Sequence, residues 1–171
     1  MACTELQLAF NTLLLVEGPT DVTTFQQFLG IYKKDHKIVI LPLGRKSLIA
    51  PTSEPQLAEL RRISDQILAI VDSQKASADA PVEAAILGFQ AVCGNLGIKC
   101  HVLERRATEN YFPDTAIKRA CKDDRLRSLG HYEEFAGVLP RRHKRENWRI
   151  AREMTKGDVD ATDLGPILDA H

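Results

Sequence analysis

Two carboxylates stand at the ends of apolar segments that predict buried strands. Glu17 follows TLLLV (12–16), and Asp72 closes QILAIVD (66–72). Short, continuous apolar runs are typical of parallel strands covered on both faces. In such a sheet the carboxyl ends of the strands meet at one edge, so both side chains would face one crevice. Neighbouring carboxylates repel, and Mg²⁺ is commonly held by one or two carboxylates together with water and substrate phosphate. The positions therefore predict a metal site.

Helix capping is the alternative explanation for acidic residues after strands. Asp21 fits it well, because it stands in the first turn of the predicted helix, where the helix dipole favours an anion. Glu17 fits it poorly, since it precedes that position by four residues. Asp21 therefore has two interpretations, as a cap and as a further candidate metal ligand.

Glycine-rich phosphate loops do not explain the segment GPTD after the first strand. Such loops offer successive backbone N–H groups, and Pro19 has none. GRKS (44–47) does not match the GxxxxGK[ST] pattern, and the GxGxxG pattern of dinucleotide-binding folds is missing from the sequence. Direct nucleotide binding by a glycine-rich loop is therefore discounted.

The elements that must position these carboxylates alternate regularly. Strands are predicted at 12–16, 37–44, 66–72 and 98–104, with helices beginning near Asp21 and covering 54–64 and 81–97. Ser53 is a candidate cap of the second helix, and Pro81 is expected in the first turn of the third. The alternation predicts an α/β fold with a mostly parallel sheet flanked by helices. The side chains expected to face inward are Val22, Phe25, Phe28 or Leu29, Tyr32, Leu57, Leu60, Ile63, Ala85, Phe89, Val92 and Leu96.

The pattern becomes helical after residue 104. Segment 108–122 predicts a helix interrupted near Pro113, 141–154 a charged helix, and 161–171 a short closing helix. We expect one domain over 1–171, with a core over about 10–112 and a helical C-terminal part over about 113–171.

Composition narrows the class of protein. Of the 171 residues 44% are hydrophobic and the formal net charge is zero, yet residues 99–153 hold 14 Lys and Arg against 9 Asp and Glu. A basic zone suits a phosphate-bearing partner, and a solvated face with internal ion pairs is the alternative. No apolar run is long enough for a membrane span, and the N-terminus lacks the pattern of a secretory signal. Without a CxxC pair, the four cysteines predict reduced thiols in a cytoplasmic protein.

Four segments together resemble a known family. LLLVEGPTDVTTFQQFL resembles the opening motif of the topoisomerase–primase (TOPRIM) domain, in which the first strand ends in a metal-associated Glu-Gly, here Glu17-Gly18. VDSQ stands where that family has Asp-x-Asp, with Asp72 first and Gln74 in place of the second Asp. VLERRATENYFP and RHKRENWRIAREM resemble later segments of the overcoming-lysogenization-defect (OLD) nucleases, and the acidic DVDATDLGPIL resembles the end of such domains. The resemblance covers nearly the whole chain and implies a Rossmann-like TOPRIM fold.

The resemblance implies a metal-dependent nuclease that hydrolyses the phosphodiester bonds of nucleic acid. Glu17, Asp72 and Glu109 would hold one or two Mg²⁺ or Mn²⁺ ions, with Asp21 and Gln74 as further candidates. Lys144, which corresponds to a functional lysine of the family, would act beside Glu17 and Asp72 in catalysis by neutralising charge on the reacting phosphate. The candidates for backbone contacts with DNA, or with RNA such as tRNA, are Lys46, Arg105, Arg106, Arg141, Arg142 and Arg145.

Two departures from the family pattern leave alternatives open. Gln74 brings no charge to a metal, which favours a nucleic-acid-binding or regulatory subunit with a degenerate site. OLD nucleases usually carry an ATPase module, and this sequence has no Walker motif. We therefore expect either a stand-alone subunit with a separate partner ATPase in antiviral (phage) defence or an excised domain. A primase- or topoisomerase-type module and a homo-oligomer also remain open.

Overall fold

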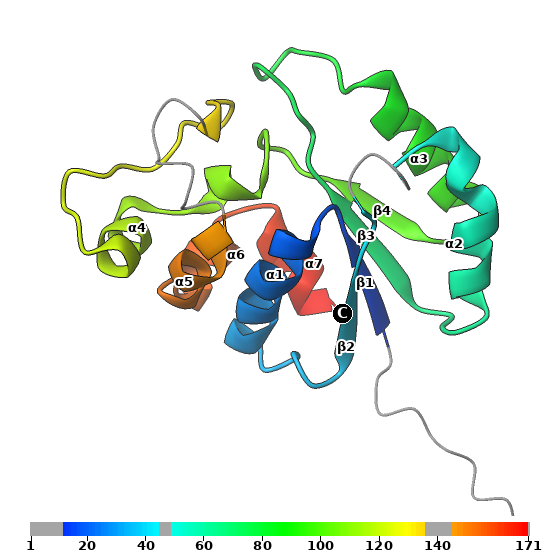
Figure 1. The fold of residues 1–171 in the computed structure, drawn as a ribbon, viewed down its shortest axis with the longest axis horizontal. Coiled ribbons are helices and arrows are strands. Elements are labelled where there is room, and N and C mark those ends of the chain that lie inside the picture. Colours follow the sequence, from blue (N-terminus) through cyan, green and yellow to red (C-terminus); the bar gives the residue numbers. More distant parts are fainter. Residues whose placement is uncertain (1–11, 45–48, 136–144, 171) are drawn as a thin grey trace, which may run out of the picture.

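The computed structural model describes residues 12–44, 49–135 and 145–170. At its centre lies a four-stranded sheet with the order β2-β1-β3-β4 (Figure 1). The strands are β1 (Thr12–Val16), β2 (Ile38–Pro42), β3 (Ile67–Val71) and β4 (Lys99–Val102), and every neighbouring pair is parallel. The predicted α/β class is confirmed, and the arrangement is consistent with a Rossmann-like fold.

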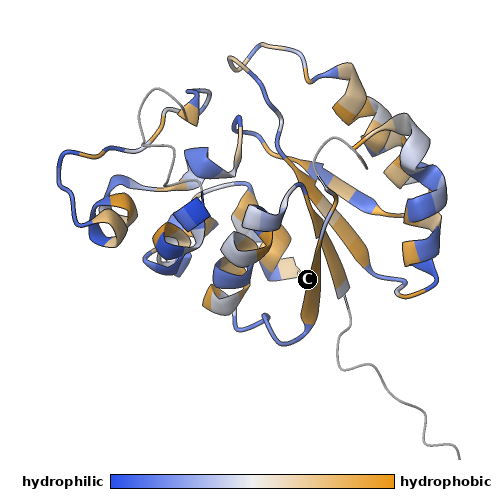
Figure 2. Cartoon of the chain, in the orientation of Figure 1, coloured by the Kyte–Doolittle hydropathy of each residue, from blue (hydrophilic) through white to orange (hydrophobic). Residues whose placement is uncertain are grey.

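Helices cover both faces of this sheet. On one face lie α1 (Pro19–Ile31) and α5 (Asn147–Arg152), and on the other lie α2 (Glu54–Arg61) and α3 (Ala84–Asn95) (Figure 1). Side chains of β1 alternate accordingly, because Leu14 and Val16 pack with α1 and α5 while Leu13 and Leu15 pack with α2 and α3. Figure 2 shows that the central strands are mainly apolar, while the helices carry both polar and apolar residues.

The C-terminal part joins the core on the α1 side. After β4 come the 3-10 turn η3 (Thr108–Tyr111), α4 (Asp114–Cys121), α5, α6 (Lys156–Asp160) and α7 (Leu164–Ala170). The predicted interruption at Pro113 is confirmed, since this proline separates η3 from α4. Ile150, Val159, Leu164 and Leu168 are buried in the same cluster as Leu14 and Val16. The C-terminal helices therefore help to build the core of the sheet domain.

Two predicted helices differ from the structure at their ends. After the 3-10 turn η2 (Pro51–Ser53), α2 ends at Arg61, and Ile63 lies in the following turn with 52% of its surface exposed, so its predicted inward position is wrong. Ser53 occupies the predicted N-cap position of α2, but its hydroxyl donates to the Ala50 carbonyl at 2.6 Å and makes no capping hydrogen bond. Helix periodicity does not apply beyond the last helical turn.

α3 begins later than predicted. Its first residue is Ala84, and Pro81 lies before the helix in an irregular segment that packs Val82 against the core. Ala85 is exposed and was wrongly expected to face inward, whereas Phe89 and Val92 are buried as expected. Among the described residues, no helix combines the length and the apolar character that crossing a membrane requires.

The strand order creates a switch point between β1 and β3. The chain leaves β1 towards β2 on one side and leaves β3 towards β4 on the other. In open parallel sheets, ligands bind in the crevice outside the carboxyl ends of the strands at such a point. β1 and β3 are in register with Val16 opposite Ile70. Glu17 and Asp72, which follow these strands, therefore belong to the edge where a ligand is expected.

Candidate metal centre

Asp72 is held in place at this edge by hydrogen bonds from Thr108. Its Oδ1 accepts hydrogen bonds from the backbone N and the hydroxyl of Thr108, at 3.1 and 3.3 Å. Burial raises the pKa of Asp72 well above its usual range, and the negative charges of Glu109, Glu17 and Asp21 raise it further, against a smaller lowering effect of the Thr108 N–H. The structure thus brings the four predicted carboxylates into one electrostatic cluster.

Glu109 reaches the cluster from the turn η3. Its side chain is buried and accepts a hydrogen bond from Asn147 Nδ2 at 3.2 Å. The next residue, Asn110, locks the turn, because its Oδ1 accepts from Ala107 N at 3.1 Å and its Nδ2 donates to the carbonyl oxygens of Gly130 and Glu133. Glu109 is therefore presented by a rigid turn.

Asp72 and Glu109 line a common pocket of about 250 Å³. The other residues that line it are Gln74, Arg106, Ala107, Asn110, Glu133, Glu134 and Phe135. The sequence offered no periodicity that joins positions 72 and 109, and only the family resemblance had paired them. The shared pocket supports that pairing on geometric grounds.

Glu17 and Asp21 lie on either side of the start of α1. Gly18 N donates to Asp21 Oδ2 at 2.8 Å, and Asp21 N donates to the Gly18 carbonyl at 3.1 Å. The capping role predicted for Asp21 is thereby confirmed. Glu17 is partly buried, and its negative charge contributes to the raised pKa of Asp72.

Gln74 has an uncommon backbone conformation beside Asp72. Its φ is +55°, in the left-handed region that residues other than glycine seldom adopt. The conformation is held by a hydrogen bond from Gln74 N to the Arg106 carbonyl at 2.9 Å and by one from the Ser73 hydroxyl to the Arg105 carbonyl at 2.8 Å. The Gln74 side-chain amide lies 3.4 Å from Asp72 Oδ2 and donates to it. Strained positions of this kind gather at functional sites.

The two predicted phosphate-binding arginines after β4 have different surroundings. Arg105 stacks on the Tyr111 ring, with its guanidinium carbon 4.8 Å from the ring centre, and donates to the Asn110 carbonyl at 2.8 Å. It therefore supports the turn that carries Glu109. Arg106 lines the pocket and pairs with Glu134 at 2.9 Å.

The remaining predicted cations are only partly described. Arg145 is exposed just before α5. Lys46, Arg141, Arg142 and Lys144 lie outside the described residues.

A buried network that sequence reasoning missed fastens η3 to the C-terminal helices. Asp163 accepts from the Tyr111 hydroxyl at 2.7 Å and from Glu104 N at 3.1 Å, and it lies 2.7 Å from His101 Nε2. Asn147, which contacts Glu109, was also missed. Both positions lie in segments that resemble the family, but nothing in those segments singled them out, because their partners are distant in sequence.

The donor atoms of this centre fit a hard divalent cation. Carboxylate and amide oxygens suit Mg²⁺ and Mn²⁺. Within 12–44, 49–135 and 145–170, no group of three or more His, Cys, Asp or Glu residues is arranged to hold a metal ion. The pocket instead offers the pair Asp72 and Glu109, and Mg²⁺ is often held by two carboxylates with water and substrate phosphates.

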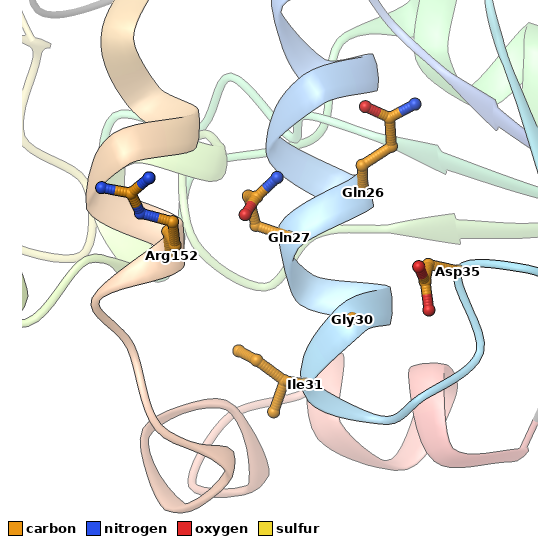
Figure 3. Close-up of a pocket in the computed structure, with 6 residues that line it drawn as sticks. All are labelled: Gln26, Gln27, Gly30, Ile31, Asp35 and Arg152. Atoms are coloured by element: carbon orange, nitrogen blue, oxygen red, sulfur yellow. The ribbon is translucent and has the colours of Figure 1, made fainter.

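A second pocket, of about 550 Å³, lies at the other end of α1. Gln26, Gln27, Gly30, Ile31, Asp35 and Arg152 line it, and Figure 3 shows Gln27 and Arg152 on facing sides of α1 and α5. It contains one carboxylate and one guanidinium, with no further titratable group in its lining. It lacks the carboxylate pair that distinguishes the centre around Asp72.

Comparisons of the chain with protein-family models and with curated proteins found no significant match.

Proposed function

We propose that this chain is a Mg²⁺- or Mn²⁺-dependent nuclease of the TOPRIM type that hydrolyses phosphodiester bonds of nucleic acid. One observation carries the proposal: Asp72 lies at the sheet's switch point among Glu109, Glu17 and Asp21, whose charges raise its pKa. Stability alone does not favour such a cluster, because like charges oppose one another. A reaction at an anionic phosphate that depends on a bound cation would explain why carboxylates are gathered at this position.

The residues around the pocket would divide the work between them. Asp72 and Glu109, with Glu17 beside them, would hold the cation, and Thr108 and Asn147 orient the two carboxylates by hydrogen bonds. A bound cation supplies charge neutralisation and a more acidic water. The Arg106 guanidinium would exchange Glu134 for a substrate phosphate, to which its planar donors are suited.

Exposed arginines on α5 and just before it support binding of a nucleic-acid backbone. Arg149 and Arg152 are exposed on α5, where Arg152 also lines the pocket shared with α1, and Arg145 is exposed just before the helix. The guanidinium carbons of Arg149 and Arg152 lie 5.4 and 5.6 Å from the Trp148 ring centre. Glu146 and Glu153 lie 3.4 and 3.9 Å from Arg149 and Arg152 and offset part of this charge. Phosphate contacts carry no sequence information, so weak sequence preference is expected.

The decisive experiment is a cleavage assay of the full chain on plasmid DNA and on total tRNA, with Mg²⁺, Mn²⁺ or EDTA. Wild-type protein should cut with either metal and not in EDTA. Glu17→Ala and Asp72→Asn should each lose about 100-fold or more of the activity, the scale expected when one charge-stabilising group is removed. Asp65→Asn is the matched control, because that side chain is 98% exposed and pairs only loosely with Arg61 at 3.9 Å. Equal activity of Asp72→Asn and wild type would disprove the proposal.

Because the sequence resembles OLD nucleases, we also propose that the chain acts with a partner ATPase in phage defence. If the isolated chain does not cut nucleic acid, addition of the partner ATPase should then produce cleavage.

A non-catalytic nucleic-acid-binding subunit is the second candidate function. The observation that favours it is Gln74, whose amide donates to Asp72 at the position where the family has a second metal-binding Asp. Isothermal titration calorimetry with Mn²⁺ separates the two candidates. Binding of nucleic acid without measurable binding of Mn²⁺ would favour the subunit.

A further inference from the structure

Asn147 carries a buried oxygen whose surroundings are incomplete. The residue begins α5 and is 1% exposed. Its Nδ2 donates to Glu109 Oε1 at 3.2 Å, while its Oδ1 is the one buried side-chain polar atom without a hydrogen-bond partner in the described part of the chain. Buried acceptors are satisfied in most proteins, so an exception calls for a group that completes it.

The orientation of the Asn147 amide follows from its neighbour. A glutamate carboxylate only accepts hydrogen bonds, so the amide nitrogen must face Glu109 Oε1. Exchanging the amide O and N would set two acceptors against each other. The atom without a partner is therefore an acceptor that lies beside a carboxylate.

A cation satisfies this acceptor and its carboxylate neighbours together. Glu109, which accepts from the Asn147 amide, shares its pocket with Asp72. Amide oxygens of asparagine are regular ligands of hard divalent cations. A bridging water would complete Oδ1 alone, whereas a divalent cation would also be bound by the carboxylate oxygens of Asp72 and Glu109.

We infer that Asn147 Oδ1 is a further ligand of the divalent cation held by Asp72 and Glu109. The inference rests on the metal centre of the proposed function and adds to it a neutral oxygen from α5. Cation binding then ties α5, with its exposed arginines, to the turn η3 and to the end of β3. Occupancy of the site therefore stabilises the placement of these arginines beside the pocket.

The test of the inference is the affinity of the full chain for Mn²⁺ in the absence of nucleic acid. Mn²⁺ is titrated into the protein, and binding is measured by calorimetry and by electron paramagnetic resonance of the free Mn²⁺. Asn147→Ala should weaken Mn²⁺ binding by about 10- to 100-fold, and Asn147→Asp, which keeps an oxygen, should bind more tightly than Asn147→Ala. Asn95→Ala, an identical change at an exposed position of α3, should leave the affinity unchanged.

If Asn147→Ala does not fold, amide hydrogen exchange of the wild-type protein with and without Mn²⁺ provides a second test. Mn²⁺ should increase protection of amides in 147–152 and leave those in 84–95 unchanged. Wild-type Mn²⁺ affinity in Asn147→Ala, or no added protection of 147–152, would overturn the inference and leave the proposed nuclease intact. Failure of the wild-type protein to bind Mn²⁺ would instead reject the metal centre and the inference together.

Discussion

Asp72 and Asp163 are both removed from solvent to a large extent, but their surroundings shift their pKa values in opposite directions. Burial and the charges of Glu109, Glu17 and Asp21 raise the pKa of Asp72. Burial would also raise the pKa of Asp163, but hydrogen bonds from His101, Tyr111 and the Glu104 backbone outweigh it and lower that pKa. The ionised carboxylate of Asp72 therefore lowers the stability of the folded protein, whereas the ionised carboxylate of Asp163 raises it.

Asp72→Asn should stabilise the metal-free protein at neutral pH. The folded-state pKa of Asp72 lies above the unfolded one, so its contribution to stability declines as pH rises from the ordinary aspartate pKa, about 3.9, through the folded pKa. Thermal unfolding in EDTA near pH 7 should show a gain of about 0.5–2 kcal/mol, which shrinks towards pH 4. Mg²⁺ should raise the melting temperature of the wild type only. A lower melting temperature of the variant in EDTA would contradict this account.

Asp163→Asn should have the opposite effect. Asp163 has a folded-state pKa below the unfolded one, so its stabilisation is present above the ordinary aspartate pKa and is lost as pH falls through the folded pKa. Its side chain is 8% exposed, and the loss should be about 2–4 kcal/mol near pH 7. Urea unfolding at several pH values should show the difference from wild type narrowing below about pH 4. A difference independent of pH would mean that the charge of Asp163 is not what matters.

At the scale of elements, the contact between α6 and α7 depends on Gly165. A Cβ built there would lie 2.6 Å from the Asp160 Cα and 3.0 Å from the Val159 carbonyl oxygen, both backbone atoms that cannot move away cheaply. The same close approach places Leu164 and Leu168 in the core. Asp163, which fastens η3, immediately precedes α7.

Gly165→Ala should therefore destabilise the protein by about 1–3 kcal/mol, as overpacking does. Gly94→Ala is the matched control, because a Cβ there meets nothing within 4 Å and the position lies inside α3. That control should be neutral or stabilising by up to about 1 kcal/mol, as expected for Gly to Ala in a helix. Chemical denaturation measures both variants, and equal stability of the two would show that α6 and α7 can separate without cost.

At the scale of the whole molecule, the carboxylate pocket is connected to α5, a helix that exposes arginines. Asn147 links them, because it contacts Glu109 from the same helix that exposes Arg149 and Arg152. A polyanion that lies along α5 would have its backbone brought to the edge of the pocket. Screening by salt should weaken such binding.

The triple change Arg145→Gln, Arg149→Gln and Arg152→Gln should weaken nucleic-acid binding. Each lost phosphate contact should also reduce the slope of log affinity against log salt by about 0.7–0.9. Fluorescence anisotropy with labelled single-stranded and duplex oligonucleotides, between about 50 and 200 mM salt, measures both effects. Arg61→Gln and Arg62→Gln at the C-terminal end of α2, across the sheet, serve as the control. An unchanged slope in the triple variant would place the binding face elsewhere.

The sequence by itself determined the sheet and the edge at which its ligand is expected. Apolar runs before Glu17 and in front of Asp72 require strands buried on both faces, and alternation with helices requires those strands to be parallel. These rules depend on local hydrophobicity and chain direction, which a single sequence contains. The same rules did not locate the ends of α2 and α3. Ile63 was expected inside α2 but follows it, and Pro81 was expected inside α3 but precedes it.

The tertiary structure alone decided which side chains meet. Glu109 was expected from a resemblance, but its place beside Asp72 depends on the turn that Asn110 and Arg105 hold together. Asn147 contacts Glu109 only because α5 packs against α1. Side chains in irregular segments are positioned by packing and by hydrogen bonds to distant residues, and neither has a period along the chain.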